Sequence, residues 1–250
     1  MMPPPIQKYS IEKMLTAVNN NQKTKQHYET TIASSTGDTI VVPDDYSSIQ
    51  EAVDHANNGD TIYVRIGIYT ENIDVYKPLK IIGEERNTTI IEGKNKGDHI
   101  FDVTADNVEI TRFTIKNTSL GRAGIKIESD NCKVRDNIVH ECGDGIWIVE
   151  SDNVTIQNNQ VYHNNFGIYA DGIKSIQIID DVFNANGDGV VLLQSSNVNL
   201  VNNKIINNDF NGVLHILCKS SFINKNDIHF NGNIGLKMLS SNDNSIKNTL

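Results

Sequence analysis

Apolar residues follow two different spacings in the first half of the chain. Short runs such as TIVV, TIYV, LKIIG and TIIEG are separated by turn residues, which predicts short β-strands. The stretch SSIQEAVDHANNGD instead has apolar residues at a helical spacing, with Ser47 or Ser48 as N-cap and Gly59 as the end. We therefore expect one short α-helix over about residues 47–57. Its apolar face would consist of Ile49, Ala52, Val53 and Ala56.

From about residue 100 the pattern becomes a repeat. A glycine followed by an aliphatic residue recurs at spacings of 21, 22, 22, 23 and 23 residues. These glycines are Gly124, Gly145, Gly167, Gly189, Gly212 and Gly235. Leucine-rich repeats share this period, but Asn, Ile and Val stand here where they need leucine. The repeat predicts an all-β fold, a right-handed parallel β-helix with coils of roughly 22 residues and about three short strands per coil.

The repeat also defines the domain organisation. Residues 1–37 are polar and carry three consecutive prolines, so we expect a disordered or loosely ordered arm, with one short helix in IEKMLTAVN. Residues 38–250 would form the β-helix, which the helix over 47–57 caps and in which regular coils occupy about 100–250. The C-terminus shows no cap, which predicts end-to-end self-association or a missing C-terminal segment.

Two columns of polar residues recur with the period and predict internal hydrogen-bonded ladders. Stacked side-chain amides can satisfy the main-chain groups that tight turns leave unpaired. One column is Asn137, Asn159, Asp181 and Asn203, and the other is Cys142, Asn164, Asn186, Asn208 and Asn231.

The charge of the chain narrows the set of partners. The net charge is -9 and the pI is about 5.2, which argues against nucleic acid as a partner. No apolar run reaches the roughly 18 residues of a membrane span. No signal peptide is visible, which implies the cytoplasm if the chain is complete. Three cysteines argue against a disulfide framework.

The segment IQEAVDHANNGDTIYVRIGIYTENIDVYKPLKIIGEERNTTIIEG resembles the entry segment of pectin-lyase-like parallel β-helix proteins, in particular the NosD-type and carbohydrate-binding and sugar hydrolase (CASH) domains. The resemblance implies the fold, a link to carbohydrate, export from the cytoplasm and, through NosD, copper. The G-D-D, G-H-G and D-P-H motifs of enzymes in this superfamily are not found.

Alternation along the repeat strands places an aromatic pair on an outer strip. Trp147 and Tyr169 would stand one coil apart, with Lys126, Glu128 and Asp171 beside them. Sugar rings stack on aromatic faces, and charged groups bind their hydroxyls, so the leading hypothesis is a polysaccharide-binding module without strong catalytic activity. The alternative for this face is a structural solenoid, where the arm or a partner covers it. The apolar residues Val191, Leu193, Leu214 and Ile216 favour such a cover.

A polysaccharide lyase or glycoside hydrolase is the second hypothesis. A lyase needs a basic residue beside aspartates that hold calcium, and Arg112, Asp136 and Asp180 fall in one column. A hydrolase needs two carboxylates, and Asp144 and Asp188 lie two coils apart, about 10 Å. A surface ion pair and turn formation are the structural alternatives for these two sets.

Copper is expected from the NosD resemblance alone. His140, Cys142, His215 and Cys218 are the candidate ligands. Each also suits a structural role as a packed or turn residue, so no cofactor is predicted from the residues themselves.

Overall fold

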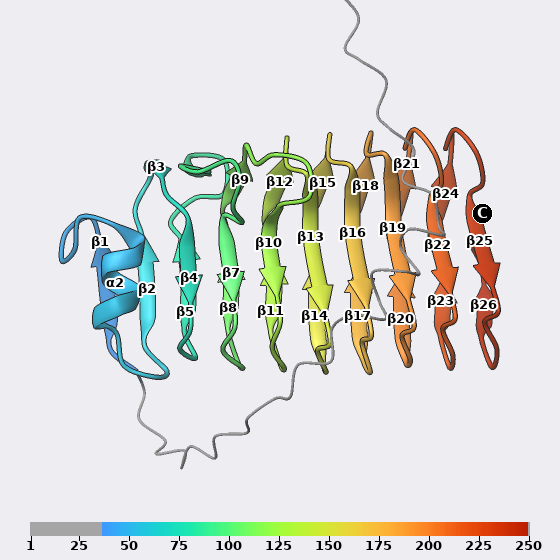
Figure 1. Ribbon diagram of the computed structural model, residues 1–250, viewed down its shortest axis with the longest axis horizontal. Helices are drawn as coiled ribbons and strands as arrows, with labels where there is room; N and C mark the ends of the chain where they lie inside the picture. Colours follow the sequence, from blue (N-terminus) through green and yellow to red (C-terminus); the bar gives the residue numbers. More distant parts are fainter. Residues whose placement is uncertain (1–36, 250) are drawn as a thin grey trace, which may run out of the picture. The chain divides into compact units, whose positions relative to one another are not determined.

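The computed structural model describes residues 37–249, which form a parallel β-helix, so the predicted fold is confirmed (Figure 1). The predicted arm and the helix in IEKMLTAVN lie outside the described residues. Three parallel sheets run along the stack, and every strand pairs with its equivalent in the next coil.

Sheet A has ten strands. They are β1 (Thr39–Val42), β2 (Thr61–Val64), β5 (Lys80–Gly83), β8 (Glu109–Thr111), β11 (Lys133–Arg135), β14 (Val154–Gln157), β17 (Ile176–Ile179), β20 (Val198–Val201), β23 (Phe222–Asn224) and β26 (Ser245–Lys247). Sheet B has eight strands. They are β3 (Gly67–Thr70), β6 (Thr89–Glu92), β9 (Thr114–Lys116), β12 (Ile138–His140), β15 (Gln160–Tyr162), β18 (Val182–Asn184), β21 (Lys204–Ile206) and β24 (Asp227–His229).

Sheet C also has eight strands, labelled along the middle of Figure 1. They are β4 (Ile73–Val75), β7 (Phe101–Val103), β10 (Ala123–Ile127), β13 (Asp144–Val149), β16 (Phe166–Asp171), β19 (Asp188–Leu193), β22 (Val213–Ile216) and β25 (Leu236–Leu239). Parallel pairing already includes β1, but the first coils differ in length. The paired residues Ile62, Ile81 and Ile110 are 19 and 29 residues apart, because irregular loops interrupt the period there.

The single helix of the described residues, α2 (Ile49–His55), lies at the N-terminal end of the stack (Figure 1). The Ser48 hydroxyl accepts a hydrogen bond from the Glu51 N–H, which identifies Ser48 as the N-cap. The predicted face of Ile49, Ala52, Val53 and Ala56 is buried against the first coil. The helix ends at His55, before the expected stop, and Gly59 instead occupies a left-handed turn with a φ of 91°.

Side chains that point into the coils form one aliphatic core. In β13, for example, Ile146 and Ile148 are fully buried, and they pair with Ile168 and Ala170 of β16. Phe101, Phe113 and Phe183 are the largest buried side chains. Aromatic residues make up only 6% of the sequence. This fits the fold, because coils that stack at about 4.8 Å leave little room for large side chains between them.

The two predicted ladders run inside the stack. Asn159 Oδ1 accepts from the Asn137 N–H at 3.0 Å, and Asn159 Nδ2 donates to the Val134 carbonyl at 3.0 Å. The second ladder repeats this geometry, starting where the Cys142 N–H donates to Asn164 Oδ1 at 2.9 Å. Each asparagine thus satisfies one main-chain N–H and one main-chain carbonyl of the preceding coil, which stabilises the turns.

Asparagines have another function at the surface turns. Residues such as Asn158 and Asn202 have φ values of 56° and 60°, the left-handed region that asparagine tolerates better than most residues. The repeat glycines instead give room to the ladder. A Cβ on Gly167 would lie 2.4 Å from the Gly189 carbonyl oxygen and 3.1 Å from Asn186 Nδ2.

Candidate functional site

Outward-facing side chains of sheet C form one continuous row, because the strands pair in register and side chains alternate between the two faces. The row passes from β4 to β25 through Asp74, Asp102, Lys126, Trp147, Tyr169, Val191, Leu214 and Lys237. We call it the sheet C row. Its character changes along the stack from charged to aromatic and then to aliphatic.

Trp147 lies at the centre of the row and is half-buried. Its ring makes edge contacts with two neighbours, His99 at 5.5 Å and Tyr169 at 6.2 Å between centroids. The Trp147 and Tyr169 rings are inclined at 89°, so the two rings do not lie in one plane. Among the described residues, the buried Trp147 Nε1 has no hydrogen-bond partner.

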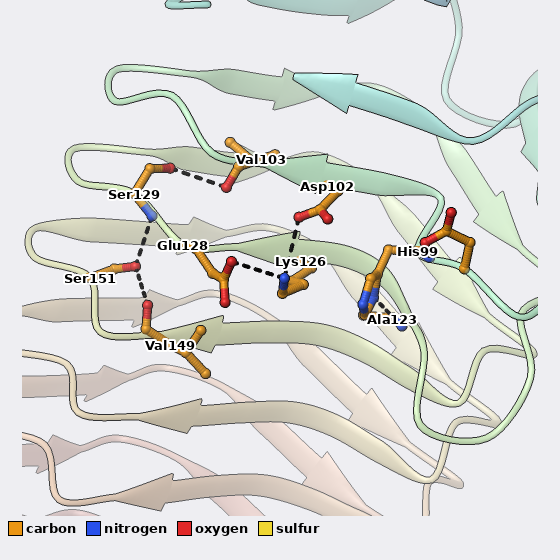
Figure 2. A network of polar contacts seen from close by, with 10 residues as sticks. His99, Asp102, Val103, Ala123, Lys126, Glu128, Ser129, Val149 and Ser151 are labelled. Carbon is orange, nitrogen blue, oxygen red and sulfur yellow. Dashed lines mark hydrogen bonds and ion pairs between the residues drawn. The ribbon is translucent and has the colours of Figure 1, made fainter. Parts of the chain in front are cut away.

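Lys126 lies between two carboxylates, as Figure 2 shows. Its Nζ is 3.0 Å from Glu128 Oε2 and 3.5 Å from Asp102 Oδ1. The contact with Asp102 is an ion pair, but it is too long for a good hydrogen bond. The Lys126 side chain is only 15% exposed. Burial raises the pKa of Asp102, although the nearby Lys126 opposes this shift.

His99 reaches the same site from the loop between β6 and β7 (Figure 2). Its Nδ1 accepts a hydrogen bond from the Ala123 N–H at 2.9 Å, so the neutral ring carries its proton on Nε2. Burial, followed by the charges of Lys126 and Arg122, lowers the pKa of His99 to about 4. The ring is therefore neutral at physiological pH and braces the edge of Trp147.

Three residues of this site, His99, Asp102 and Asp74, are not evident from the sequence pattern. All three precede the regular repeat, so no column of equivalent residues revealed which way they point. The short pattern HIFDV does contain a signal, because Phe101 and Val103 must face inward and Asp102 therefore outward.

Asp171 and Tyr169 mark the point where the row turns apolar. Burial raises the pKa of Asp171, and the charge of Glu150 adds to the shift. Burial also raises the pKa of Tyr169. Beyond them, the outward side chains form a second hydrophobic cluster with Phe166 and Tyr169. Its buried members are Val191, Leu193, Leu214 and Ile216, with 1%, 7%, 6% and 8% of their surface exposed.

The lyase candidates lie outside the sheet C row. Arg112, Asp136 and Asp180 occupy left-handed turns between sheets A and B, at φ values of 68°, 57° and 60°. Arg112 donates to the Glu84 carbonyl. Asp136 and Asp180 each accept a hydrogen bond from the asparagine amide of the next coil. These contacts suit turn formation.

The hydrolase candidates Asp144 and Asp188 begin two strands of sheet C, and Phe166 of the intervening strand lies between them. Asp188 accepts from the main-chain and side-chain nitrogens of Asn211, at 2.9 and 2.7 Å. Asp144 is buried, which raises its pKa to about 6. The two carboxylates are therefore separated by an aromatic side chain.

The four candidate copper ligands are dispersed. His140 stacks on Tyr162 on the outer face of sheet B, with centroids 4.9 Å apart. Cys142 is a member of the inner ladder, and burial raises the pKa of its thiol to about 11. His215 points into the core, where Nε2 lies 2.8 Å from Ser221 Oγ, and Cys218 is also buried. The four candidates therefore do not converge on one site, and residues 37–249 contain no group of three or more His, Cys, Asp or Glu that could hold a metal ion.

Comparison with known proteins identifies the family. The family model described as "Periplasmic copper-binding protein (NosD)" matches residues 53–165 and 121–250, and the chain belongs to this family. No curated protein matches the sequence. Within residues 37–249, no helix is long and apolar enough to cross a membrane.

Solved structures share the fold at low identity. The A-module of the mannuronan C-5 epimerase AlgE4 from Azotobacter vinelandii matches with a TM-score of 0.63 and 20% identity, over 85% of this chain and 74% of that one. The AlgE6 A-module from the same organism gives 0.60 and 16%, over 80% and 69%. The catalytic domain of a GH87 α-1,3-glucanase, in complex with tetrasaccharides, gives 0.54 and 12%, over 90% and 61%.

Proposed function

We propose that the protein binds polysaccharide along the outer face of sheet C, with Trp147 and Tyr169 as the aromatic contacts. Lys126, Glu128 and Asp171 border them and supply polar groups for sugar hydroxyls. The observation that carries the proposal is the Trp147 indole. Its ring is half-buried on the outer face of sheet C and lies beside the half-buried Tyr169 of the next strand, so part of an aromatic surface is open to a sugar ring.

The perpendicular rings determine how a sugar would bind. Because the Tyr169 and Trp147 rings are perpendicular, a given pyranose can stack on the face of only one of them. His99 also contacts the indole, so the ring is packed between two aromatic side chains before a ligand arrives. Preorganisation of this kind lowers the entropic cost of binding.

The comparisons support this proposal through the fold alone, because their sequence identity is at most 20% among the three structures described. Those proteins are named for reactions on polysaccharides. The family description, a periplasmic protein, supports a location outside the cytoplasm, where such polymers are found. Catalysis is not part of the proposal.

Tryptophan fluorescence during titration with neutral, amino-sugar and acidic polysaccharides tests the proposal. Trp147 is the only tryptophan, so any change in emission originates at the site. We expect a saturable shift for at least one polymer, and Tyr169→Ala should weaken its binding by roughly 5–10-fold. Trp147→Phe lacks the fluorophore, so its binding is measured by calorimetry, and we expect a similar loss of affinity.

Tyr162→Ala is the matched control, because Tyr162 is also a half-buried tyrosine in an aromatic stack but lies on sheet B. Its affinity for the polymer should equal that of the wild type. Shielded emission that no polymer alters would contradict the proposal. Analysis of the bound polymer for cleavage products tests the lyase and hydrolase alternative.

A further inference from the structure

The charges next to Trp147 define the kind of sugar that the site can accept. Three steps of the sheet C row separate Asp74 from Trp147, a distance of about 14 Å at about 4.8 Å per strand. A glycan that stacks on Trp147 and continues toward β4 must therefore pass over Lys126, Asp102 and Asp74.

Lys126, the cation in this part of the row, already has carboxylates that balance its charge. Lys126 is held between Glu128 and Asp102, at 3.0 and 3.5 Å, and its side chain is mostly buried. Arg122 directs Nε to the Gly97 carbonyl at 2.7 Å. His99 is neutral because its Nδ1 accepts the Ala123 N–H. The charge of Lys126 is therefore compensated and His99 is uncharged, while the exposed Arg122 keeps its charge at the edge of this stretch, outside the row.

Within the row itself, carboxylates outnumber cations on this stretch, since Asp74 and Asp102 accompany the single cation Lys126. Asp74 is paired in register with Asp102 of the adjacent strand. The loop that carries His99 adds Asp98 together with Lys94 and Lys96, so it contributes no surplus of acid. Burial raises the pKa of Asp74, and the charges of Asp102, Asp98 and Asp54 raise it further. Such crowding of like charges is relieved by a cation and made worse by an anion.

We propose that the bound glycan is an amino-sugar polymer with free amino groups, in which one sugar stacks on Trp147 and an ammonium group lies over Asp102 and Asp74. This inference rests on the proposed function, because the aromatic pair defines the site and the carboxylates set its charge preference. The same charges disfavour polymers of uronic acids.

Calorimetric titration with three hexasaccharides separates the two claims. The probes are a β-1,4-linked glucosamine hexamer, its fully N-acetylated counterpart and a mannuronate hexamer. We expect the glucosamine hexamer to bind roughly 10-fold or more tightly than the N-acetylated one, with an affinity that falls as salt is added. The mannuronate hexamer should bind most weakly.

Two variants assign the preference to the carboxylates. Asp74→Asn and Asp102→Asn, made singly, should each lower the affinity for the glucosamine hexamer several-fold and leave that for the N-acetylated hexamer within about twofold. Asp243→Asn removes the same charge at an exposed turn and should change neither affinity. The fluorescence of Trp147 shows whether each variant is folded.

The possible results distinguish the inference from the proposed function. Tightest binding of mannuronate, or equal binding of the two glucosamine-based hexamers, would overturn the amino-sugar inference and leave polysaccharide binding intact. Failure of all hexamers and of all polymers in the fluorescence titration would overturn both.

Discussion

The inner ladders and the sheet C row are both columns of stacked residues, but they differ in how much they vary. In the ladder from Asn164 to Asn231, asparagine recurs in every coil, with donor and acceptor both in use. In the sheet C row, acid, base, aromatic and aliphatic side chains follow one another within a few strands.

The difference follows from solvent access. A buried main-chain N–H must find an acceptor inside the protein, so each ladder position is restricted to side chains that can provide one. An outward side chain can be satisfied by water or by a ligand. Variation along the stack is therefore tolerated outside, and we infer that the binding specificity of this protein lies there.

The strongest test of this comparison is removal of one ladder amide. In Asn186→Ala, the Asn164 N–H loses its acceptor at 3.1 Å, and the Val161 carbonyl loses its donor at 3.0 Å. Several buried groups would be left unsatisfied, so the free energy of unfolding should fall by about 3–5 kcal/mol. Urea unfolding followed by circular dichroism measures the change.

Asn184→Ala in the same coil is the matched control. Asn184 lies on the outer face of sheet B and accepts one exposed hydrogen bond from Asn207. Its removal should cost less than about 1 kcal/mol. Equal losses in the two variants would mean that the inner ladder has no special role in stability.

A second test uses the one acid in the ladders. Asp181 occupies an asparagine position, and among residues 37–249 its buried Oδ2 has no hydrogen-bond partner. Burial raises its pKa from 3.8 to about 7. The folded state therefore favours the protonated acid, and the stability of the wild type should fall as pH rises from about 4 to about 7, while the unfolded chain ionises first.

Asp181→Asn restores the missing donor. At about pH 8 the variant should exceed the wild type in free energy of unfolding by roughly 2–4 kcal/mol, and the difference should shrink below about pH 4. Urea unfolding across this range gives the comparison. A difference that does not depend on pH would show that ionisation of Asp181 is not its cause.

The smallest expected effect concerns the support of the outer aromatic pair. In His99→Ala, the buried Ala123 N–H loses its acceptor and Trp147 loses the contact along one edge. The free energy of unfolding should fall by about 1–3 kcal/mol, and the emission of Trp147 should shift to longer wavelength as water reaches the ring. His229→Ala, on the outer face of sheet B, should leave the emission unchanged.

The C-terminal coil leaves two apolar side chains partly exposed. Leu239 of β25 and Ile246 of β26 are 38% and 48% exposed, unlike equivalent residues of the inner coils. The predicted end-to-end self-association stays a prediction. Size determination in solution would test it.

The sequence by itself determined the coil, because a glycine every 21 to 23 residues and matching asparagine columns leave few folds other than a stack of parallel strands. The two ladders and the placement of Trp147 and Tyr169 in one row followed from period and alternation. Tertiary structure decided how the site is built. The loop with His99 lies outside the repeat, and the perpendicular rings depend on packing against side chains from other coils. A repeat fixes which residues are neighbours along the stack, whereas ring orientation, charge compensation and contacts from irregular loops arise only when the coils pack.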